Sequence, residues 1–377
     1  MADTKKRLQF ADMMKGLAIL GVLFYHLTAP CGFKYVLEHI TENFLIVFFF
    51  FSGYFYKVGK RSLGQSIGTR FKATMFPFVK YSLIFWVIGS AYLLIAGLET
   101  IIDALCCLRN FYGGCIWNRV IQNWFGWEYH SLGKRYMFLA DFWFLLALLL
   151  ASVLFFVLAE FVLPSKWKTL TASVVLFAVT GVLRAFAVSL PYNLQLVPFW
   201  TAFLLLESLA QYNSAFELKW MSGAKGWISS VIALAAGVAI AMLKEPSVNL
   251  FRGNFAEGEV VSMLLTIASS LLFIWGLGNI CRLAETSGIR VKELSWLGSH
   301  SLLIYLFHMF FAWIICIITG FSLSFEETVT FDVVLKSLLL GVVCLGLCIL
   351  LNIIVDKIKA KIEEHKSKQS AKALGTE

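Results

Sequence analysis

The chain has 377 residues, of which 59% are hydrophobic and only 15% are charged. A soluble domain carries about 25% charged residues, so this composition, with a mean hydropathy of +0.78, excludes a water-soluble protein. It predicts an all-α integral membrane protein whose main partner is the lipid bilayer. The net charge is +9, but in a membrane protein the position of the charges matters more than their sum, and no nucleic acid partner is expected.

Ten apolar segments have about the length that spans a bilayer, for which about 20 residues are needed. The segments 43–58 and 194–211 are short, which predicts tilted or partly re-entrant helices. We therefore expect a bundle of about ten transmembrane helices. The segments are 11–29, 43–58, 75–97, 139–163, 169–190, 194–211, 226–243, 259–281, 297–320 and 332–355.

Lysine and arginine gather in alternate connections, which predicts that these connections face the cytoplasm. With ten spans both termini lie on that side. The predicted organisation is a membrane domain over residues 1–356 and a basic cytoplasmic tail, 357–377, that is solvated and partly disordered. The basic residues are Lys5, Lys6, Arg7, Lys57, Lys60, Arg61, Arg70, Lys72, Lys166, Lys168, Lys219, Lys225, Arg282, Arg290, Lys292, Lys357, Lys359, Lys361, Lys366, Lys368 and Lys372.

The third connection, 98–138, carries charges of both signs and is predicted to be a long external loop. Its rings could stack on a sugar face, and an aromatic cap over the bundle is an equally good interpretation. The rings are Phe111, Tyr112, Trp117, Trp124, Phe125, Trp127 and Tyr129.

The first apolar segment contains three ionisable residues, Asp12, Lys15 and His26. Lys15 and His26 are eleven residues apart, close to three helical turns, so they share a face and lie about 16 Å apart along the axis. Ionisable groups in a membrane helix indicate a functional site. His26 is a candidate general base, or else an interfacial anchor. Lys15, held by Asp12, is a candidate cation for phosphates or an oxyanion, or else half of a boundary ion pair.

Ser52 and Gly53 interrupt a run of phenylalanines at the end of the second segment. Glycine permits close backbone approach, and serine supplies a hydroxyl where water is absent. The basic residues that follow fit the cytoplasmic topology alone. They also fit a cradle for a phosphorylated cofactor, in which Arg70 and its neighbour Lys72 are the expected contacts. Ser52 and Gly53 are the further candidate contacts for this cofactor.

Polar residues in the fourth and ninth segments are candidate substrate contacts. Asp141 could orient a substrate hydroxyl beside Trp143, although tryptophan is common at a membrane interface. Tyr305 and His308 are three residues apart and share a helical face. A histidine in mid-membrane is costly, so His308 is expected to face the bundle interior.

The remaining polar residues give weaker indications. Arg184 needs a partner inside the membrane, and Glu207 is a candidate. Eight cysteines show no metal-ligand spacing, so no metal is expected. Disulfides stay undecided among Cys31, Cys106, Cys107 and Cys115.

Five motifs together resemble the membrane acyltransferase type 3 family, in particular its fucose 4-O-acetylase-like branch of sugar O-acetyltransferases. The family hallmark is a basic residue, ten intervening residues and then histidine. Lys15 stands where many members have arginine, and it keeps the charge without the bidentate geometry. The motifs occur in the family's order over nearly the whole chain. They are Asp12-x-x-Lys15 to His26, Phe49-Phe-Phe-Ser52-Gly53-Tyr54-Phe55, Arg70 with Pro77, Phe142-Trp143-Phe144-Leu145 and Ser301-Leu-x-Ile-Tyr305-Leu-x-His308.

This resemblance implies a ten-helix bundle in a bacterial plasma membrane, with acetyl-CoA as cytoplasmic donor and a carbohydrate at the outer face as acceptor. His26 would take the proton of a sugar hydroxyl, whose oxygen then attacks the thioester. Lys15, Ser52 or a backbone amide would stabilise the oxyanion. A ping-pong route through an acyl-His26 intermediate stays open.

Two alternatives remain at this point. One is a transporter or flippase for a lipid-linked sugar, which the absence of an internal repeat disfavours. The other is the same type of enzyme with a different donor, such as succinyl-CoA. The sequence leaves the acceptor and the oligomeric state open, a homodimer included.

Overall fold

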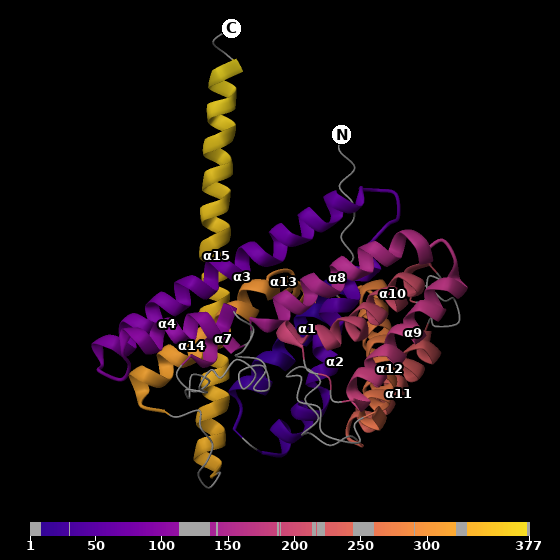
Figure 1. Ribbon diagram of the computed structural model, residues 1–377, viewed down its shortest axis with the longest axis horizontal. Helices are drawn as coiled ribbons and strands as arrows, with labels where there is room; N and C mark the ends of the chain where they lie inside the picture. The colour runs from indigo at the N-terminus through magenta and orange to yellow at the C-terminus, as the bar shows by residue number, and fades with distance from the viewer. Residues whose placement is uncertain are drawn as a thin grey trace.

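The structure is a computed structural model that describes residues 9–29, 31–112, 136–140, 142–186, 188, 190–212, 216, 223–243, 260–289, 291–321 and 330–374. Within these ranges all regular secondary structure is helical, and ten helices are long and apolar enough to cross a membrane. The predicted all-α membrane bundle is therefore confirmed (Figure 1).

The helices are given in chain order, and Figure 1 labels all of them except η1. They are α1 (Gln9–Leu27), α2 (Gly32–Tyr54), α3 (Leu63–Ile95), α4 (Ile101–Tyr112), α7 (Met137–Ala140), α8 (Trp143–Val162), α9 (Lys166–Ala185), the 3-10 helix η1 (Pro191–Leu196), α10 (Val197–Tyr212), α11 (Gly223–Ala241), α12 (Val260–Thr286), α13 (Lys292–Ser299), α14 (Ser301–Thr319) and α15 (Phe331–Leu374).

The second span is longer than predicted. α2 has 23 residues and begins at Gly32, so the expectation of a short helix starting at residue 43 is wrong. The error arises because Glu42 and Asn43 look like loop residues, whereas both are buried against α12. The sixth span is not short either: it covers 20 residues, Tyr192–Gln211, because η1 precedes the 16 residues of α10.

The connection between the third and fourth spans is partly helical. α4 occupies Ile101–Tyr112, so this part of the 98–138 stretch, predicted to be a long external loop, is a helix. A hydrogen bond joins α4 to α3: Trp86 Nε1 donates to the Ala104 carbonyl at 3.0 Å. Trp117, Trp124, Phe125, Trp127 and Tyr129 lie outside the described residues.

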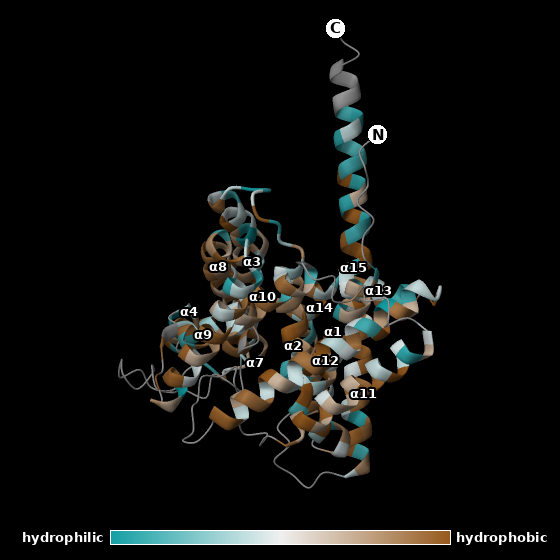
Figure 2. Cartoon of the chain, turned by 90° about the vertical axis from the view of Figure 1, so that its right-hand side faces the viewer, coloured by the Kyte–Doolittle hydropathy of each residue, from teal (hydrophilic) through white to brown (hydrophobic). Residues whose placement is uncertain are grey.

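The tail is also helical. α15 runs for 44 residues to Leu374, well beyond the apolar bundle (Figures 1 and 2). The expectation of partial disorder is therefore wrong, because alanine, lysine, glutamate and glutamine are strong helix formers and i,i+4 pairs such as Glu364–Lys368 at 2.5 Å support the extension. The expectation of solvation is confirmed, since residues 359–369 are exposed.

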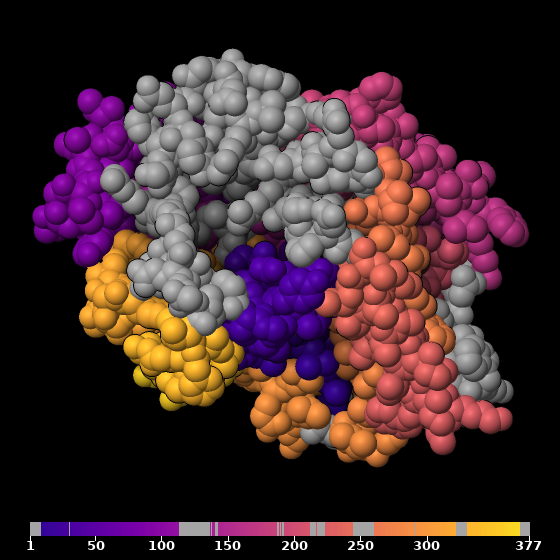
Figure 3. Space-filling model, turned by 90° about the horizontal axis from the view of Figure 1, so that it is seen from below, coloured from indigo at the N-terminus to yellow at the C-terminus, as the bar shows by residue number. Residues whose placement is uncertain are grey.

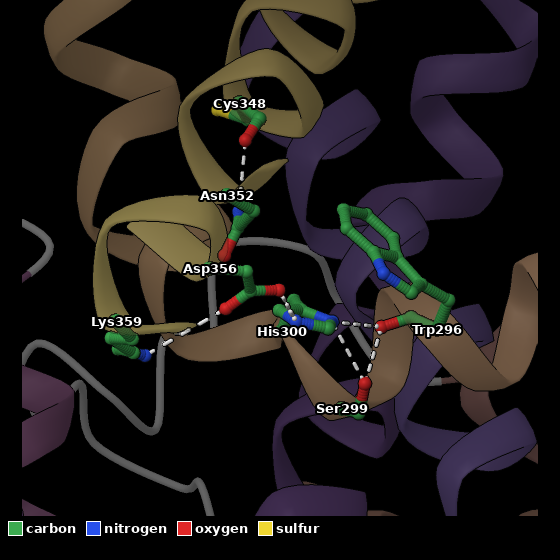
Figure 4. A network of polar contacts seen from close by, with 7 residues as sticks. All are labelled: Trp296, Ser299, His300, Cys348, Asn352, Asp356 and Lys359. Atoms are coloured by element: carbon green, nitrogen blue, oxygen red, sulfur yellow. Dashed lines mark hydrogen bonds and ion pairs between the residues drawn. The ribbon is translucent and has the colours of Figure 1, made fainter. Parts of the chain in front are cut away.

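Several helix ends meet on one face of the bundle. The backbone N–H of Phe10 at the start of α1 donates to Glu285 at the end of α12, at 3.0 Å. His300, between α13 and α14, contacts Asp356 of α15 at 2.8 Å (Figure 4). We call this the basic face, because its connections carry Lys57, Lys60, Arg61, Lys166 and Lys168.

The helices that carry the candidate site are central. In the apolar windows of α1 and α2, 67% and 78% of residues are buried, against 28% for α9, α11 and α15. The face opposite the basic face shows α1 and α2, in indigo, at its centre (Figure 3). The peripheral helices therefore face lipid, while α1 and α2 hold the interior.

Candidate active site

Two histidines from distant parts of the chain meet inside the bundle. His26 is in the last turn of α1 and His308 is in the middle of α14, and their ring centroids are 5.4 Å apart, with 49° between the ring planes. His308 is fully buried, whereas His26 is partly exposed. The sequence put both residues in one site without predicting that their rings are neighbours.

A backbone contact sets the tautomer of His308. Its Nδ1 lies 2.7 Å from the Tyr305 carbonyl oxygen. A carbonyl only accepts, so Nδ1 carries the hydrogen and Nε2 of the neutral ring is an acceptor. The Tyr305 and His308 rings lie 6.1 Å apart, so the predicted shared face is present.

A line of ring contacts runs from this pair toward the basic face. The ring of Phe144 in α8 lies 5.2 Å from Tyr305 and 5.9 Å from Phe48 in α2. Phe48 is one turn from Ser52, whose hydroxyl donates to the Phe48 carbonyl at 3.2 Å. Trp143 packs beside Phe144 at 6.1 Å, whereas Asp141 lies outside the described residues.

Ser52 and Arg70 line a common cavity of about 270 Å³ at the basic face. We call it the basic cavity, because three further cations line it. Burial and the neighbouring Glu160 carboxylate raise the pKa of its Tyr56 hydroxyl, which therefore stays neutral at physiological pH. The lining residues are Ser52, Phe55, Tyr56, Lys57, Lys60, Arg61, Ser66, Thr69, Arg70, Ala73 and Phe156.

Two residues predicted for this cradle do not line the basic cavity. Lys72 is exposed and absent from its walls. Gly53 faces α10 instead, where a Cβ would overlap the Leu204 carbonyl, and Ser208 donates to the Gly53 carbonyl at 3.0 Å. Gly53 thus allows close helix packing, which is the usual role of a glycine in a membrane helix.

Asp12 and Lys15 form the expected pair, with 3.1 Å between Oδ1 and Nζ. The Lys15 ammonium also lies over the Phe51 ring, 5.6 Å from its centroid. Helix α13 packs flush on this turn, since a Cβ on Gly298 would overlap the Asp12 carbonyl. Lys15 does not line the basic cavity, so this pair is built into the α1–α2–α13 contact.

The suggested pairing of Arg184 with Glu207 is wrong. Within the described residues no hydrogen bond or ion pair joins them, and the buried Glu207 carboxylate lies against Gly53 instead. Arg184 lies in the last turn of α9, whereas Glu207 lies toward the other end of the antiparallel α10, beside Gly53.

A buried polar cluster between α2 and α12 was missed. Thr266 donates to Glu42 at 3.1 Å, and Asn43 exchanges hydrogen bonds of 2.7 Å with Ser269 and Ser270. The available signal was Glu42-Asn43 directly before an apolar run, at the boundary where the predicted segment 43–58 begins. This cluster fixes α2 against α12 and so positions the helix that carries Phe48 and Ser52.

Neither metal nor disulfide chemistry is indicated by the described part of the chain. No group of three or more histidine, cysteine or acidic side chains lies together there. Cys31, Cys106 and Cys107 are free thiols, and Cys115 lies outside the described residues.

Comparison with known proteins gives a family match over nearly the whole chain. A family model described as an acyltransferase domain, of the acyltransferase 3 type, matches residues 8–353. No curated protein and no solved structure matches. The match includes α1 with His26 and α14 with His308, so the helices that form the candidate site lie inside the family domain. The chain therefore belongs to the membrane acyltransferase type 3 family and is an acyltransferase.

Proposed function

We propose that the enzyme transfers an acetyl group from cytoplasmic acetyl-CoA to a hydroxyl of a cell-surface or lipid-linked carbohydrate, with His26 as general base. The observation that carries this proposal is the line of rings from the basic cavity to the histidine pair, through Phe48, Phe144 and Tyr305. These rings are in contact with one another, so a thioester arm that follows this line toward His26 would displace them.

The basic cavity suits the nucleotide end of the donor. CoA carries several phosphate groups, and the cavity has four cationic side chains, Lys57, Lys60, Arg61 and Arg70. Charge-assisted hydrogen bonds to phosphate are about twice as strong as neutral ones. Ser52 marks the inner wall from which the pantetheine arm would extend toward Phe48.

In the proposed reaction His26 takes the proton of the acceptor hydroxyl, and the oxygen attacks the thioester carbonyl carbon. The carbon–sulfur bond breaks, and the leaving thiolate takes the proton back from His26, so no proton is gained or lost. Lys15 lies about 16 Å from His26 along α1. We therefore assign Asp12 and Lys15 to holding α1 in place rather than to oxyanion binding, and we assign Trp143, Tyr305 and His308 to the acceptor side.

A direct test measures thiol release from acetyl-CoA by the purified protein, with and without an added glycan. His26→Ala is expected to lower the rate by about 10²–10⁴-fold, the usual contribution of a general base. His365→Ala is the matched control, since His365 is exposed on the extension of α15. Equal rates for wild type and His26→Ala would refute the assignment.

The donor and acceptor are tested separately. The same assay with succinyl-CoA in place of acetyl-CoA shows which acyl group the enzyme transfers. The two candidate enzymes differ only in the donor pocket. Mass spectrometry of surface polysaccharide from cells with wild type or His26→Ala is expected to show loss of an acetyl mass. An unchanged glycan profile would contradict a surface carbohydrate acceptor.

A further inference from the structure

A second and larger cavity adjoins the basic cavity at the basic face. Its volume is about 570 Å³, and it shares Tyr56 and Lys57 with the smaller one. We call it the turn cavity, because the α8–α9 turn forms one wall. Its lining residues are Tyr56, Lys57, Val58, Leu163, Pro164, Lys166, Thr169, Ser208, Leu209 and Gln211.

The turn cavity lies at the level where a bilayer has its headgroups. Leu163 and Pro164 directly follow the spanning helix α8, and Lys166 begins the spanning helix α9. Exposed Lys166 and Lys168 on either side of Trp167 are the arrangement typical of a membrane–water interface. A molecule in this cavity would therefore sit at the boundary between lipid and cytoplasm.

The cavity also lies beside lipid-facing surface. Only 28% of the α9 apolar window is buried, and the large side chains of Phe161 and Trp167, at the two ends of the turn, are 72% and 79% exposed. The basic cavity, by contrast, is bounded by α2, α3, α8 and the 55–62 loop. A lipid can reach the turn cavity sideways from the bilayer.

The lining chemistry fits an anionic headgroup with acyl chains attached. Lys57 and Lys166 supply two positive charges, and the first turn of α9 adds its N-terminal dipole. Thr169 and Ser208 already donate their hydroxyl hydrogens to backbone carbonyls, which leaves their oxygens as acceptors. Val58, Leu163 and Leu209 line the same space and suit the apolar glycerol–acyl region.

We propose that the turn cavity binds the headgroup of an anionic phospholipid from the surrounding leaflet. The phosphate lies between Lys57 and Lys166, and hydroxyls on the headgroup donate to the oxygens of Thr169 and Ser208. The site is separate from the donor site proposed above, and it borders that site only through Tyr56 and Lys57.

The test titrates the delipidated full-length protein with phosphatidylglycerol or phosphatidylcholine and counts bound lipid by native mass spectrometry. A lysine near an anionic surface contributes a factor of about five in binding. Lys166→Gln is therefore expected to weaken phosphatidylglycerol binding about fivefold. Lys168→Gln is the matched control, because it removes the same charge from the same turn without lining the cavity.

The same titration is repeated with inorganic phosphate as competitor. The proposal is supported if the protein binds phosphatidylglycerol more tightly than phosphatidylcholine and only Lys166→Gln weakens that binding. Equal weakening by Lys168→Gln would show general surface attraction and overturn it, as would displacement of the lipid by inorganic phosphate at matched concentrations. Acetyl-CoA binding by Lys166→Gln reports on the donor site independently, so failure of one proposal is distinguishable from failure of the other.

Discussion

The contact between His26 and His308 predicts a specific catalytic defect. Replacing His308 by phenylalanine keeps a planar ring of similar size at a fully buried position. It removes both ring nitrogens: Nδ1, which donates to the Tyr305 carbonyl at 2.7 Å, and the acceptor Nε2. The packing against Tyr305 and His26 is retained, so the change isolates the polar function.

The expected magnitude follows from the charge on His26 during the reaction. His26 becomes an imidazolium when it holds the acceptor's proton. With 5.4 Å between the ring centroids, we expect this imidazolium to donate to the acceptor nitrogen of His308, and a hydrogen bond to a charged group is worth about 1.5–3 kcal/mol. Because about 1.36 kcal/mol corresponds to a tenfold change in rate, His308→Phe is expected to lower kcat by about 10- to 150-fold. KM for the donor is expected to stay the same, since His308 is remote from the basic cavity.

The assay measures thiol release from acetyl-CoA at saturating acceptor. His39→Phe is the matched control, because His39 is also buried and its Nδ1 also bonds to a carbonyl, that of Tyr35, at 2.7 Å. It makes no ring contact with His26 among the described residues. A kcat for His308→Phe within twofold of wild type, or an equal loss in His39→Phe, would refute the reasoning.

Four further outcomes are expected. Arg70→Gln is expected to raise KM for acetyl-CoA about tenfold, because it removes one charge-assisted contact to the donor. Lys72→Gln is expected to leave this KM unchanged, because Lys72 does not line the basic cavity. Steady-state kinetics measures both KM values. Gly298→Ala places a methyl group against the Asp12 carbonyl and is expected to lower the free energy of unfolding by about 1–3 kcal/mol. Gly346→Ala adds its methyl group in open space and is expected to leave the free energy of unfolding unchanged. Thermal unfolding in detergent compares the two variants. Tyr136→Phe removes hydrogen bonds of 2.6 Å to Glu99 and Ser90, destabilising the fold by about 1–3 kcal/mol at neutral pH. Burial and the Glu99 hydrogen bond raise the pKa of Tyr136. The stability that wild type has over Tyr136→Phe is therefore fully present below pH about 10 and shrinks above it. Unfolding of both proteins measured as a function of pH checks this. Burial also raises the pKa of the Cys107 thiol, so maleimide labelling read by peptide mass spectrometry is expected at the partly exposed Cys31 and Cys106 but not at Cys107.

Local properties of the chain determined the class of fold. Hydropathy over about 20 residues is a property of each segment alone, and all ten predicted spans correspond to spanning helices. The pairing of Asp12 with Lys15, and the shared face of Tyr305 and His308, also follow from helical spacing. Helix geometry fixes which residues of one helix are neighbours, so these features needed no knowledge of the other helices.

Contacts between helices could not be predicted in this way. Nothing local says that His308 of α14 packs on His26 of α1, that Arg70 and Ser52 border one cavity while Lys72 does not, or that Glu207 lies beside Gly53. The start of α2 was missed for the same reason, since Glu42 and Asn43 become acceptable in a membrane helix only through their partners on α12.

The sequence by itself thus determined the membrane bundle, its number of spans and the residue types of the site. Only the tertiary structure decided which of those residues meet. The physical reason is that helix formation and membrane insertion depend on short-range hydrogen bonds and segment hydropathy. Helix association instead depends on close packing at small residues such as Gly298 and Gly53, whose partners come from distant parts of the chain.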